Sequence, residues 1–209
     1  MTDYNYKFNS FVGSQLESLK NPTILEFGVK EGRSTKIFLQ HCKKNGGKLF
    51  SVDIDDYKRK FDDTNWTFIQ SRDDSFDYLE NQLPKKFDII YLDSLHEAEH
   101  VEKIFYYYFE KVKIGGFFFI DDISWLPYIK NSNRDNFYCE INNKETFDKL
   151  LEIYNVNFDK FDIIFDFTSS GICKIVKKSE NLIKSKIINT RILSLKNFAR
   201  KITRFFKKI

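Results

Sequence analysis

The chain is poor in the residues that cross-link, break or anchor a fold. Its three cysteines, Cys42, Cys139 and Cys173, are isolated and form no Cys-x-x-Cys pair. That pattern excludes a disulfide framework and a zinc ribbon, and it favours a reducing compartment. No apolar run reaches the length of a membrane span, and the polar N-terminus lacks the apolar segment of a signal peptide. We therefore expect a cytoplasmic protein.

Apolar bulk is plentiful, whereas proline (3) and glycine (8) are scarce. Hydrophobic residues make up 42% and aromatic residues 17% of the 209 positions, which excludes a disordered protein and allows a single domain with a core. The net charge of +4 conceals an asymmetry, because residues 181–209 hold nine Lys/Arg and no acid. Residues 1–180 therefore carry −5. We expect a domain over 1–180 and a basic tail over 181–209.

Short apolar runs alternate with segments of helical periodicity along residues 8–121, a rhythm typical of a parallel sheet with helices on both faces. The strands are expected at 23–27, 49–53, 66–70, 87–93 and 117–121, and the helices at 8–20, 34–43, 75–82, 98–111 and 144–154. We expect Gly115-Gly116 to form a turn, and residues 124–145 to be mostly irregular. Residues 161–167 and 172–176 read as a terminal antiparallel hairpin. The predicted class is a Rossmann-like α/β fold.

The turn after the first strand has the pattern Glu26-x-Gly28-x-x-x-Gly32-x-Ser34. Glycine at position 28 would let the backbone approach a ligand, and Gly32 would allow tight packing at the start of the helix. The free N–H groups of that helix could bind a carboxylate. A glycine pair also occurs in plain turns, so the motif alone does not decide between the two.

Acidic residues end four of the five expected parallel strands. They are Glu26, Asp53, Asp93 and the pair Asp121-Asp122. In an open α/β sheet ligands bind beyond the carboxyl ends of the strands. Asp53 follows Gly32 by about 20 residues, where an acid accepts the ribose hydroxyls of a nucleoside cofactor. Each acid could be a solvated strand end, but their grouping favours a binding site.

Several segments together resemble class I S-adenosylmethionine-dependent methyltransferases, in particular the cephalosporin-hydroxylase-type, macrocin-type and catechol-type O-methyltransferases. The segments are LEFGVKEGRST (25–35), LFSVDID (49–55), SRDDSFDYL (71–79), FDIIYLDSLHEAEHV (87–101) and KIGGFFFIDDI (113–123). The resemblance implies S-adenosylmethionine as cofactor. It implies further that Glu26, Gly28, Gly32 and Ser34 contact the methionine end and Asp53 the ribose. Asp74 and Ser75 would flank the adenine, and Asp93 would complete the cofactor site.

The same resemblance implies a Mg²⁺ ion held by Asp93, Asp121 and Asp122. Hard oxygen ligands suit Mg²⁺, and a hydroxyl bound to the metal loses its proton more readily. In some relatives a general base stands three positions after the first metal ligand, which here is His96, so Asp93 and His96 are the predicted catalytic residues. The alternatives are that the three acids cap a loop and a helix, and that His96 lies on the surface or caps a helix.

The chain departs from the resembled pattern after Asp93. Ser94 and Leu95 replace a Gly-Asp or Gly-Ser pair, and Ala98 replaces an aromatic residue. Acceptor recognition is expected in residues 124–143, where Trp125, Tyr128 and Tyr138 could stack on a sugar or an aromatic ring. They could equally cover the edge of the sheet.

The basic tail has an apolar stripe with lysine and arginine on the opposite face. The stripe comprises Leu195, Phe198, Ile202, Phe205 and Ile209. Such a helix is typical of a peripheral anchor on the inner face of a membrane. It could instead dock on the domain or on a partner subunit, and a homo-oligomer is compatible with the sequence. We expect no nucleic-acid binding, because the domain is acidic.

The function expected from these observations is metal-assisted O-methylation of a sugar, a glycan or another small hydroxylated acceptor. The alternative is a non-catalytic protein that binds S-adenosylmethionine and acts through its tail on a membrane or a partner, which the changes at Leu95 and Ala98 motivate. A nicotinamide dehydrogenase is disfavoured, because the turn lacks the third glycine of that fingerprint.

Overall fold

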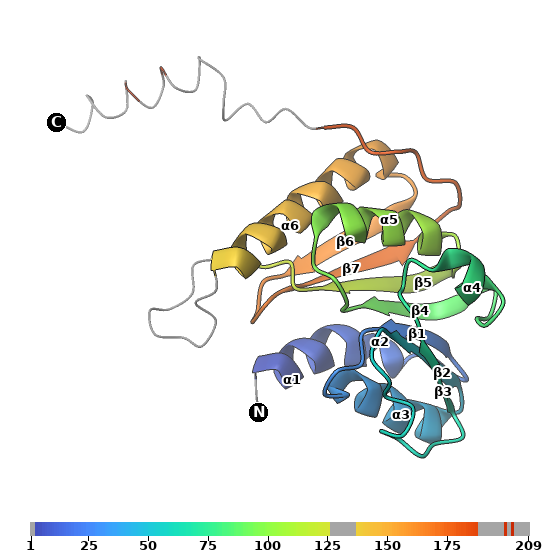
Figure 1. Ribbon diagram of the computed structural model, residues 1–209. Helices are drawn as coiled ribbons and strands as arrows, with labels where there is room; N and C mark the ends of the chain where they lie inside the picture. The colour runs from blue at the N-terminus through green and yellow to red at the C-terminus, as the bar shows by residue number, and fades with distance from the viewer. Residues whose placement is uncertain (1–2, 126–136, 188–198, 200–201, 203–209) are drawn as a thin grey trace.

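The computed structural model describes residues 3–125 and 137–187 and the positions 199 and 202. A seven-stranded sheet forms its centre, with strand order β3-β2-β1-β4-β5-β7-β6 (Figure 1). The strands are β1 (Thr23–Phe27), β2 (Lys48–Asp53), β3 (Trp66–Gln70), β4 (Phe87–Leu92), β5 (Val112–Asp121), β6 (Phe161–Asp166) and β7 (Ile172–Lys177). The first five are parallel, and β7 pairs antiparallel with both β5 and β6. The predicted fold class is confirmed.

Helices cover both faces of the sheet. One face carries α1 (Asp3–Phe8), a π-helical turn η1 (Asn9–Gly13), α2 (Ser14–Leu16) and α3 (Arg33–Asn45). The other carries α4 (Phe76–Glu80), α5 (Ala98–Phe109) and α6 (Phe137–Asn157) (Figure 1). Because successive side chains of a strand point to opposite faces, the core divides into two clusters. In β1, Ile24 packs with α3, and Leu25 packs with α5.

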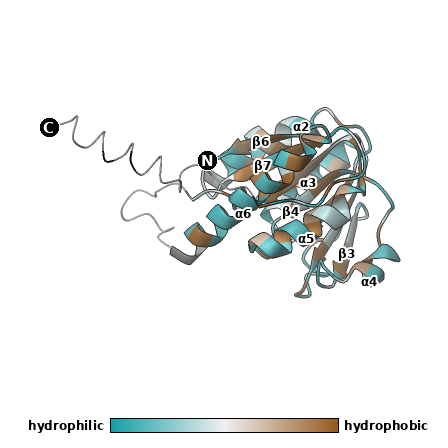
Figure 2. Ribbon diagram, turned by 90° about the horizontal axis from the view of Figure 1, so that it is seen from above, coloured by the Kyte–Doolittle hydropathy of each residue, from teal (hydrophilic) through white to brown (hydrophobic). Residues whose placement is uncertain are grey.

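Local sequence explains these elements. Strand β4 is buried on both sides, which suits its nearly continuous apolar sequence FDIIYL. On α5 the buried residues recur at three- and four-residue spacing: Val101, Ile104, Phe105, Tyr108 and Phe109. Hydrophobic residues accordingly concentrate in the central strands and on the inner faces of the helices (Figure 2).

Three elements differ from the sequence prediction by more than two residues at one end or both. The opening helical segment begins at Asp3 and ends at Leu16. Gly115 and Gly116 lie inside β5 rather than in a turn; the register against β4 shifts there, and Gly115 has φ +78°. Helix α6 begins at Phe137, so part of the segment expected to be irregular is helical. Apolar periodicity misses this start, because the early turns of α6 contain many polar residues.

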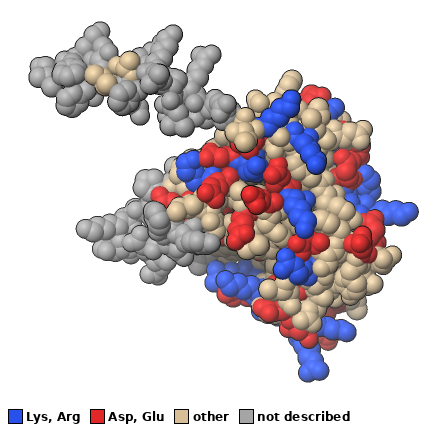
Figure 3. Space-filling model, turned by 45° about the horizontal axis from the view of Figure 1, so that its top comes forward, with Lys and Arg blue, Asp and Glu red and all other residues tan. Residues whose placement is uncertain are grey.

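Residues 181–187 run along the outer helices of the domain. The Ile183 carbonyl accepts hydrogen bonds from the Tyr106 hydroxyl (2.8 Å) and the Asn157 amide (2.7 Å), and Ser185 donates to Glu102 at 2.6 Å. Basic and acidic side chains are interspersed on the face seen in Figure 3. The predicted amphipathic segment from 195 onward lies outside the described residues, apart from isolated positions. Within the described part, no helix has both the length and the apolar character needed to cross a bilayer.

Candidate active site

The turn after β1 rests on a buried polar network centred on Glu26. This carboxyl group is fully buried and accepts hydrogen bonds from Ser34 Oγ (2.5 Å), Thr35 Oγ1 (2.8 Å) and Ser51 Oγ (2.7 Å). Burial raises the pKa of Glu26 to about 7, although the three hydroxyl donors oppose the shift. The network ties β1, the start of α3 and β2 together. It therefore fixes the shape of the turn from below.

Both glycines of the turn have positive φ angles, +92° for Gly28 and +76° for Gly32. A Cβ atom on Gly28 would lie 1.9 Å from the carbonyl oxygen of Asp93, so only glycine lets the turn pass the end of β4. A Cβ atom on Gly32 would lie 2.7 Å from the ring of Phe61. The glycine spacing is therefore a packing requirement of this turn.

A cavity of about 530 Å³ opens beyond the carboxyl ends of β1, β2 and β4, a volume within the usual range for small-molecule sites. Three predicted residues line it: Gly28, Asp53 and Asp93. The Asp53 carboxylate accepts the backbone N–H of Val29 at 2.7 Å, which joins the end of β2 to the turn. The other lining residues are Lys30, Val52, Ile54, Asp55, Tyr57, Ser71, Arg72, Asp73, Ser94, Leu95 and His100.

The remaining predicted cofactor residues lie elsewhere. Glu26, Gly32 and Ser34 support the turn from beneath and are not among the residues that line the cavity. Asp74 does not line the cavity; its carboxylate pairs with Arg72 (2.8 Å), which does line it, and with Lys103 (3.1 Å), and these cations hold the pKa of the Asp74 carboxyl well below its ordinary value. Ser75 precedes α4 and does not line the cavity either.

The acid after β3 that faces the cavity is Asp73. Its Oδ2 atom accepts a hydrogen bond from Ser94 Oγ at 2.5 Å and lies 2.9 Å from His100 Nε2. Two neighbouring acids differ in direction because the backbone turns between β3 and α4. Sequence reasoning chose Asp74, since only tertiary contacts from the loop after β4 and from α5 distinguish the pair.

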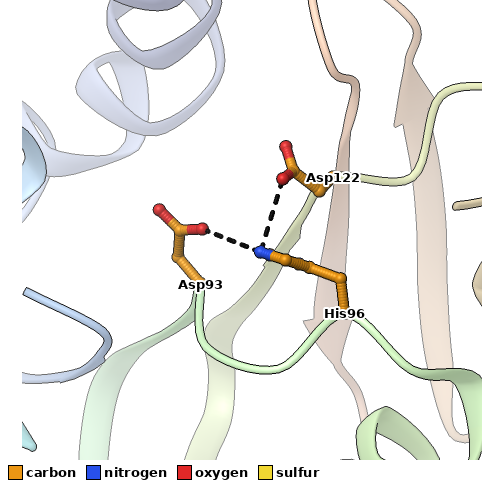
Figure 4. A group of neighbouring side chains, drawn as sticks. All are labelled: Asp93, His96 and Asp122. Atoms are coloured by element: carbon orange, nitrogen blue, oxygen red, sulfur yellow. Dashed lines mark ion pairs between the residues drawn. The ribbon is translucent and has the colours of Figure 1, made fainter. Parts of the chain in front are cut away.

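Asp93, His96 and Asp122 converge at the ends of β4 and β5 (Figure 4). His96 Nε2 lies 3.5 Å from Asp93 Oδ1 and 3.3 Å from Asp122 Oδ2. One ligand atom from each residue lies within 4.8 Å of the others, a spacing at which a single metal ion could be bound. Burial, together with the charges of Asp121 and Asp122, raises the pKa of Asp93 well above its ordinary value. A cation at this point would relieve that repulsion.

The prediction that Asp121 is a third metal ligand disagrees with its position. Asp121 is 2% exposed and forms an ion pair with the buried Lys7 of α1, while its Oδ2 atom accepts the hydroxyl of Tyr91 at 2.7 Å. Asp121 is the last residue of β5, and Asp122 beyond it has φ +57°. The two carboxylates therefore point in different directions, and only Asp122 joins Asp93 and His96.

Helix α1 is the part of the site that sequence reasoning missed. Lys7 reaches Asp121, and the hydroxyl of Tyr4 lies near Ser34 and Tyr91, where burial and the charge of Asp93 raise the pKa of the phenol. The available signal was the position of Lys7 one helical turn before Phe11, on the same side as the apolar residues of the opening segment. Of the acceptor candidates, Trp125 packs against Phe147 with the two rings tilted by 52° and their centroids 4.4 Å apart. Tyr128 lies outside the described residues, and only the backbone of Tyr138 is described.

The strand order and the terminal antiparallel hairpin are those of the class I methyltransferase fold, and the cavity lies between the turn after β1 and the acid after β2. A family model described as a methyltransferase domain matches residues 25–123. The match runs from β1 through β5 and agrees with the Rossmann-like methyltransferase fold of the chain. No curated protein sequence matches it.

Solved structures share the fold at low sequence identity. MycE methyltransferase from the mycinamycin biosynthetic pathway, in complex with Mg and SAH, has a TM-score of 0.62 and 19% identity over 86% of this chain. SAH-bound PaMTH1 of Podospora anserina has a TM-score of 0.63 and 11% identity over 79% of this chain. The fibrillarin pre-rRNA processing protein of Methanococcus jannaschii has a TM-score of 0.52 and 14% identity over 77% of this chain. These matches cover 52%, 77% and 68% of the other chains. The present chain thus spans about half the length of MycE.

Proposed function

We propose that this protein transfers the methyl group of S-adenosylmethionine to a hydroxyl oxygen of a small acceptor, with a divalent cation assisting. The observation that carries the proposal is the convergence of Asp93, His96 and Asp122 next to the cavity that contains Gly28 and Asp53. Because Asp93 belongs to both groups, a donor in the cavity and an acceptor at the three side chains would meet at this residue.

The chain's own residues would orient the donor. The turn through Gly28 and the acid Asp53 would contact the methionine and ribose parts, and Asp73 lies on the same cavity wall. Ser94 and His100 hold the Asp73 carboxylate in place. Fixed positions of this kind lower the entropic cost of bringing two substrates into line. In-line placement supplies much of the acceleration of such a transfer.

The residues fit a divalent cation such as Mg²⁺. Asp93 and Asp122 offer hard carboxylate oxygens, and their position leaves room for acceptor and water oxygens. When bound, the cation would lower the pKa of an acceptor hydroxyl. MycE was crystallised with Mg and SAH, which supports the choice of ion to test first.

His96 is proposed as the proton acceptor. Its Nε2 atom lies between the two carboxylates, which would stabilise the imidazolium that forms. The acceptor oxygen bonds to the methyl carbon, the carbon–sulfur bond breaks, and sulfur keeps the electron pair to give S-adenosylhomocysteine. The hydroxyl proton passes to His96. The positive charge of the sulfonium would thus end on the imidazolium of His96, and the overall step would balance without any further reactant.

A sugar or glycan hydroxyl is the proposed acceptor class. Trp125 follows β5 three residues after Asp122, and its ring packs with Phe147 and Phe167 near Lys144. An aromatic wall beside a basic group suits a sugar ring with polar substituents. The basic tail over 181–209 would place the enzyme at the inner membrane face, where lipid-linked acceptors occur.

The test begins with calorimetric titration of S-adenosylmethionine into wild type and Asp53→Ala, with and without Mg²⁺. We expect wild type to bind and Asp53→Ala to bind at least tenfold more weakly. Turnover is then measured on a panel of hydroxylated sugars. If the protein binds the donor but shows no turnover on any acceptor and no stimulation by metal, the non-catalytic alternative is favoured. The feature that supports this alternative is Leu95, which lines the cavity and is 46% exposed. Absence of donor binding would overturn the proposal.

His96→Gln separates the two roles open to the histidine. If His96 is the base, the variant retains Mn²⁺ binding within threefold of wild type and loses at least a hundredfold in turnover. If His96 is instead a ligand, Mn²⁺ binding falls together with turnover. Glu99→Gln, one turn along the same segment, is the matched control and should change neither quantity.

A further inference from the structure

Lys7 is a buried cation beside the proposed metal group. Its side chain is 0% exposed and ion-paired with Asp121, which ends the strand next to β4, the strand that Asp93 follows. Lys7 Nζ also donates to Ser170 Oγ at 2.9 Å and to the Gly171 carbonyl at 3.3 Å. A single ammonium group thus joins α1, β5 and the turn between β6 and β7.

The bonds of Asp121 leave its carboxylate little capacity for another partner. Oδ1 accepts from Lys7 and from the backbone N–H of Asp122 (2.9 Å), and Oδ2 accepts the Tyr91 hydroxyl (2.7 Å). The aromatic packing of Phe8 against Phe38 and Tyr91 holds α1 at this place. Moving Asp121 toward the metal group would break these bonds.

We propose that Lys7 is a positioning residue that keeps Asp121 out of the metal-binding group and reserves the ion for Asp93 and Asp122. This inference rests on the proposed metal-assisted function. It assigns different tasks to the two adjacent acids after β5: Asp121 anchors the N-terminal helix, and Asp122 binds the ion. Lys7 also neutralises one of three clustered carboxylates, which leaves a net charge of −2 for a divalent cation.

A double-mutant cycle of Lys7 and Asp121 tests the inference on the whole 209-residue chain. Mn²⁺ is the probe, because the electron paramagnetic resonance signal of the free ion gives its dissociation constant without any measurement of activity. The variants are Lys7→Met, Asp121→Asn and the double variant, in which both members of the pair become neutral at similar volume. Asp122→Asn serves as the reference for loss of a ligand, and thermal melting verifies the folding of each protein.

The expected changes follow from Coulomb interactions over a few ångströms in a partly buried site. Lys7→Met should tighten Mn²⁺ binding by roughly tenfold, Asp121→Asn should weaken it by roughly tenfold, and the double variant should stay within threefold of wild type. Asp122→Asn should weaken binding by at least a hundredfold. A purely structural ion pair would change melting temperature without this opposed pair of shifts.

Two results would overturn the inference. If the double variant loses binding as severely as Asp122→Asn, Asp121 is a ligand; if Lys7→Met leaves affinity unchanged or weaker, Lys7 does not control the site. Should Lys7→Met fail to fold, the Asp121→Asn and double variants still decide between the two assignments. Wild type that binds S-adenosylhomocysteine but no Mn²⁺ would remove the metal part of the proposed function, and this inference with it. If wild type does bind Mn²⁺ and the Lys7 and Asp121 variants bind it with the same dissociation constant, only this inference is removed.

Discussion

Replacing Glu26 by glutamine should make the stability of the protein less dependent on pH. The carboxyl group is fully buried beneath the turn after β1, and burial raises its pKa from 4.5 to about 7. Glutamine has nearly the same shape and stays neutral; its carbonyl oxygen can accept from hydroxyls on one side, and its amide N–H groups can donate to hydroxyl oxygens on the other. The substitution therefore removes the titration while keeping the network around Ser34, Thr35 and Ser51 largely intact.

The sign and size follow from proton linkage. Below pH 4.5 the group is neutral in both the folded and the unfolded chain, and its contribution to stability is fully present. As the pH rises toward 7, the unfolded chain releases the proton first, so the folded state loses this contribution. The difference between a pKa of 4.5 in the unfolded chain and about 7 in the folded chain corresponds to up to about 3 kcal/mol of folding free energy. The stability of Glu26→Gln relative to wild type should therefore rise by this amount between pH 4.5 and 8.

Urea unfolding followed by tryptophan fluorescence provides the measurement, at half-unit steps from pH 5 to 8. Trp66 is a local reporter, because its indole N–H donates to Ser51 Oγ at 2.9 Å and Ser51 in turn donates to Glu26. Groups that titrate in both proteins cancel in the difference. The exposed Glu17→Gln variant controls for the substitution itself. A difference between Glu26→Gln and wild type that stays constant within about 0.5 kcal/mol over this range would show that Glu26 is ionised in the folded protein, and would refute the reasoning.

Three further substitutions test other parts of the site and its support. Gly28→Ala should abolish donor binding in calorimetry, because its Cβ would lie 1.9 Å from a carbonyl oxygen at the end of β4; Gly115→Ala has a similar φ but no neighbour within 4 Å and should keep binding. Asp73→Asn should weaken S-adenosylhomocysteine binding about tenfold, whereas Asp74→Asn, at a residue that does not itself line the cavity, should change it less than twofold; equal effects would contradict the assignment. Lys177→Met should lower the free energy of unfolding by about 3 kcal/mol in urea titrations, because the buried ammonium donates at 2.9 Å to the carbonyls of Phe109, the last residue of α5, and Val112, the first of β5. A loss under about 1 kcal/mol would argue against that role.

The sequence by itself determined the architecture and the edge of the sheet where the site lies. Apolar runs such as Phe87–Leu92 identify strands because burial on both faces demands continuous hydrophobicity. Parallel strands place their carboxyl ends on one edge of the sheet, so the sequence alone predicts that Asp53 and Asp93 lie at the same edge. The glycine turn between β1 and α3 was found for the same reason: its pattern is local and set by backbone geometry.

The position of each acid within a neighbouring pair depends on the tertiary structure and could not be predicted from local sequence. Asp73 faces the cavity and Asp74 does not, and Asp122 joins His96 while Asp121 turns to Lys7, which is 114 positions away in the chain. Side-chain direction at a strand end depends on one or two backbone torsions, and the partner that rewards one direction comes from a distant element. No local pattern encodes such a pairing, because its energy arises only once α1 has docked against the sheet.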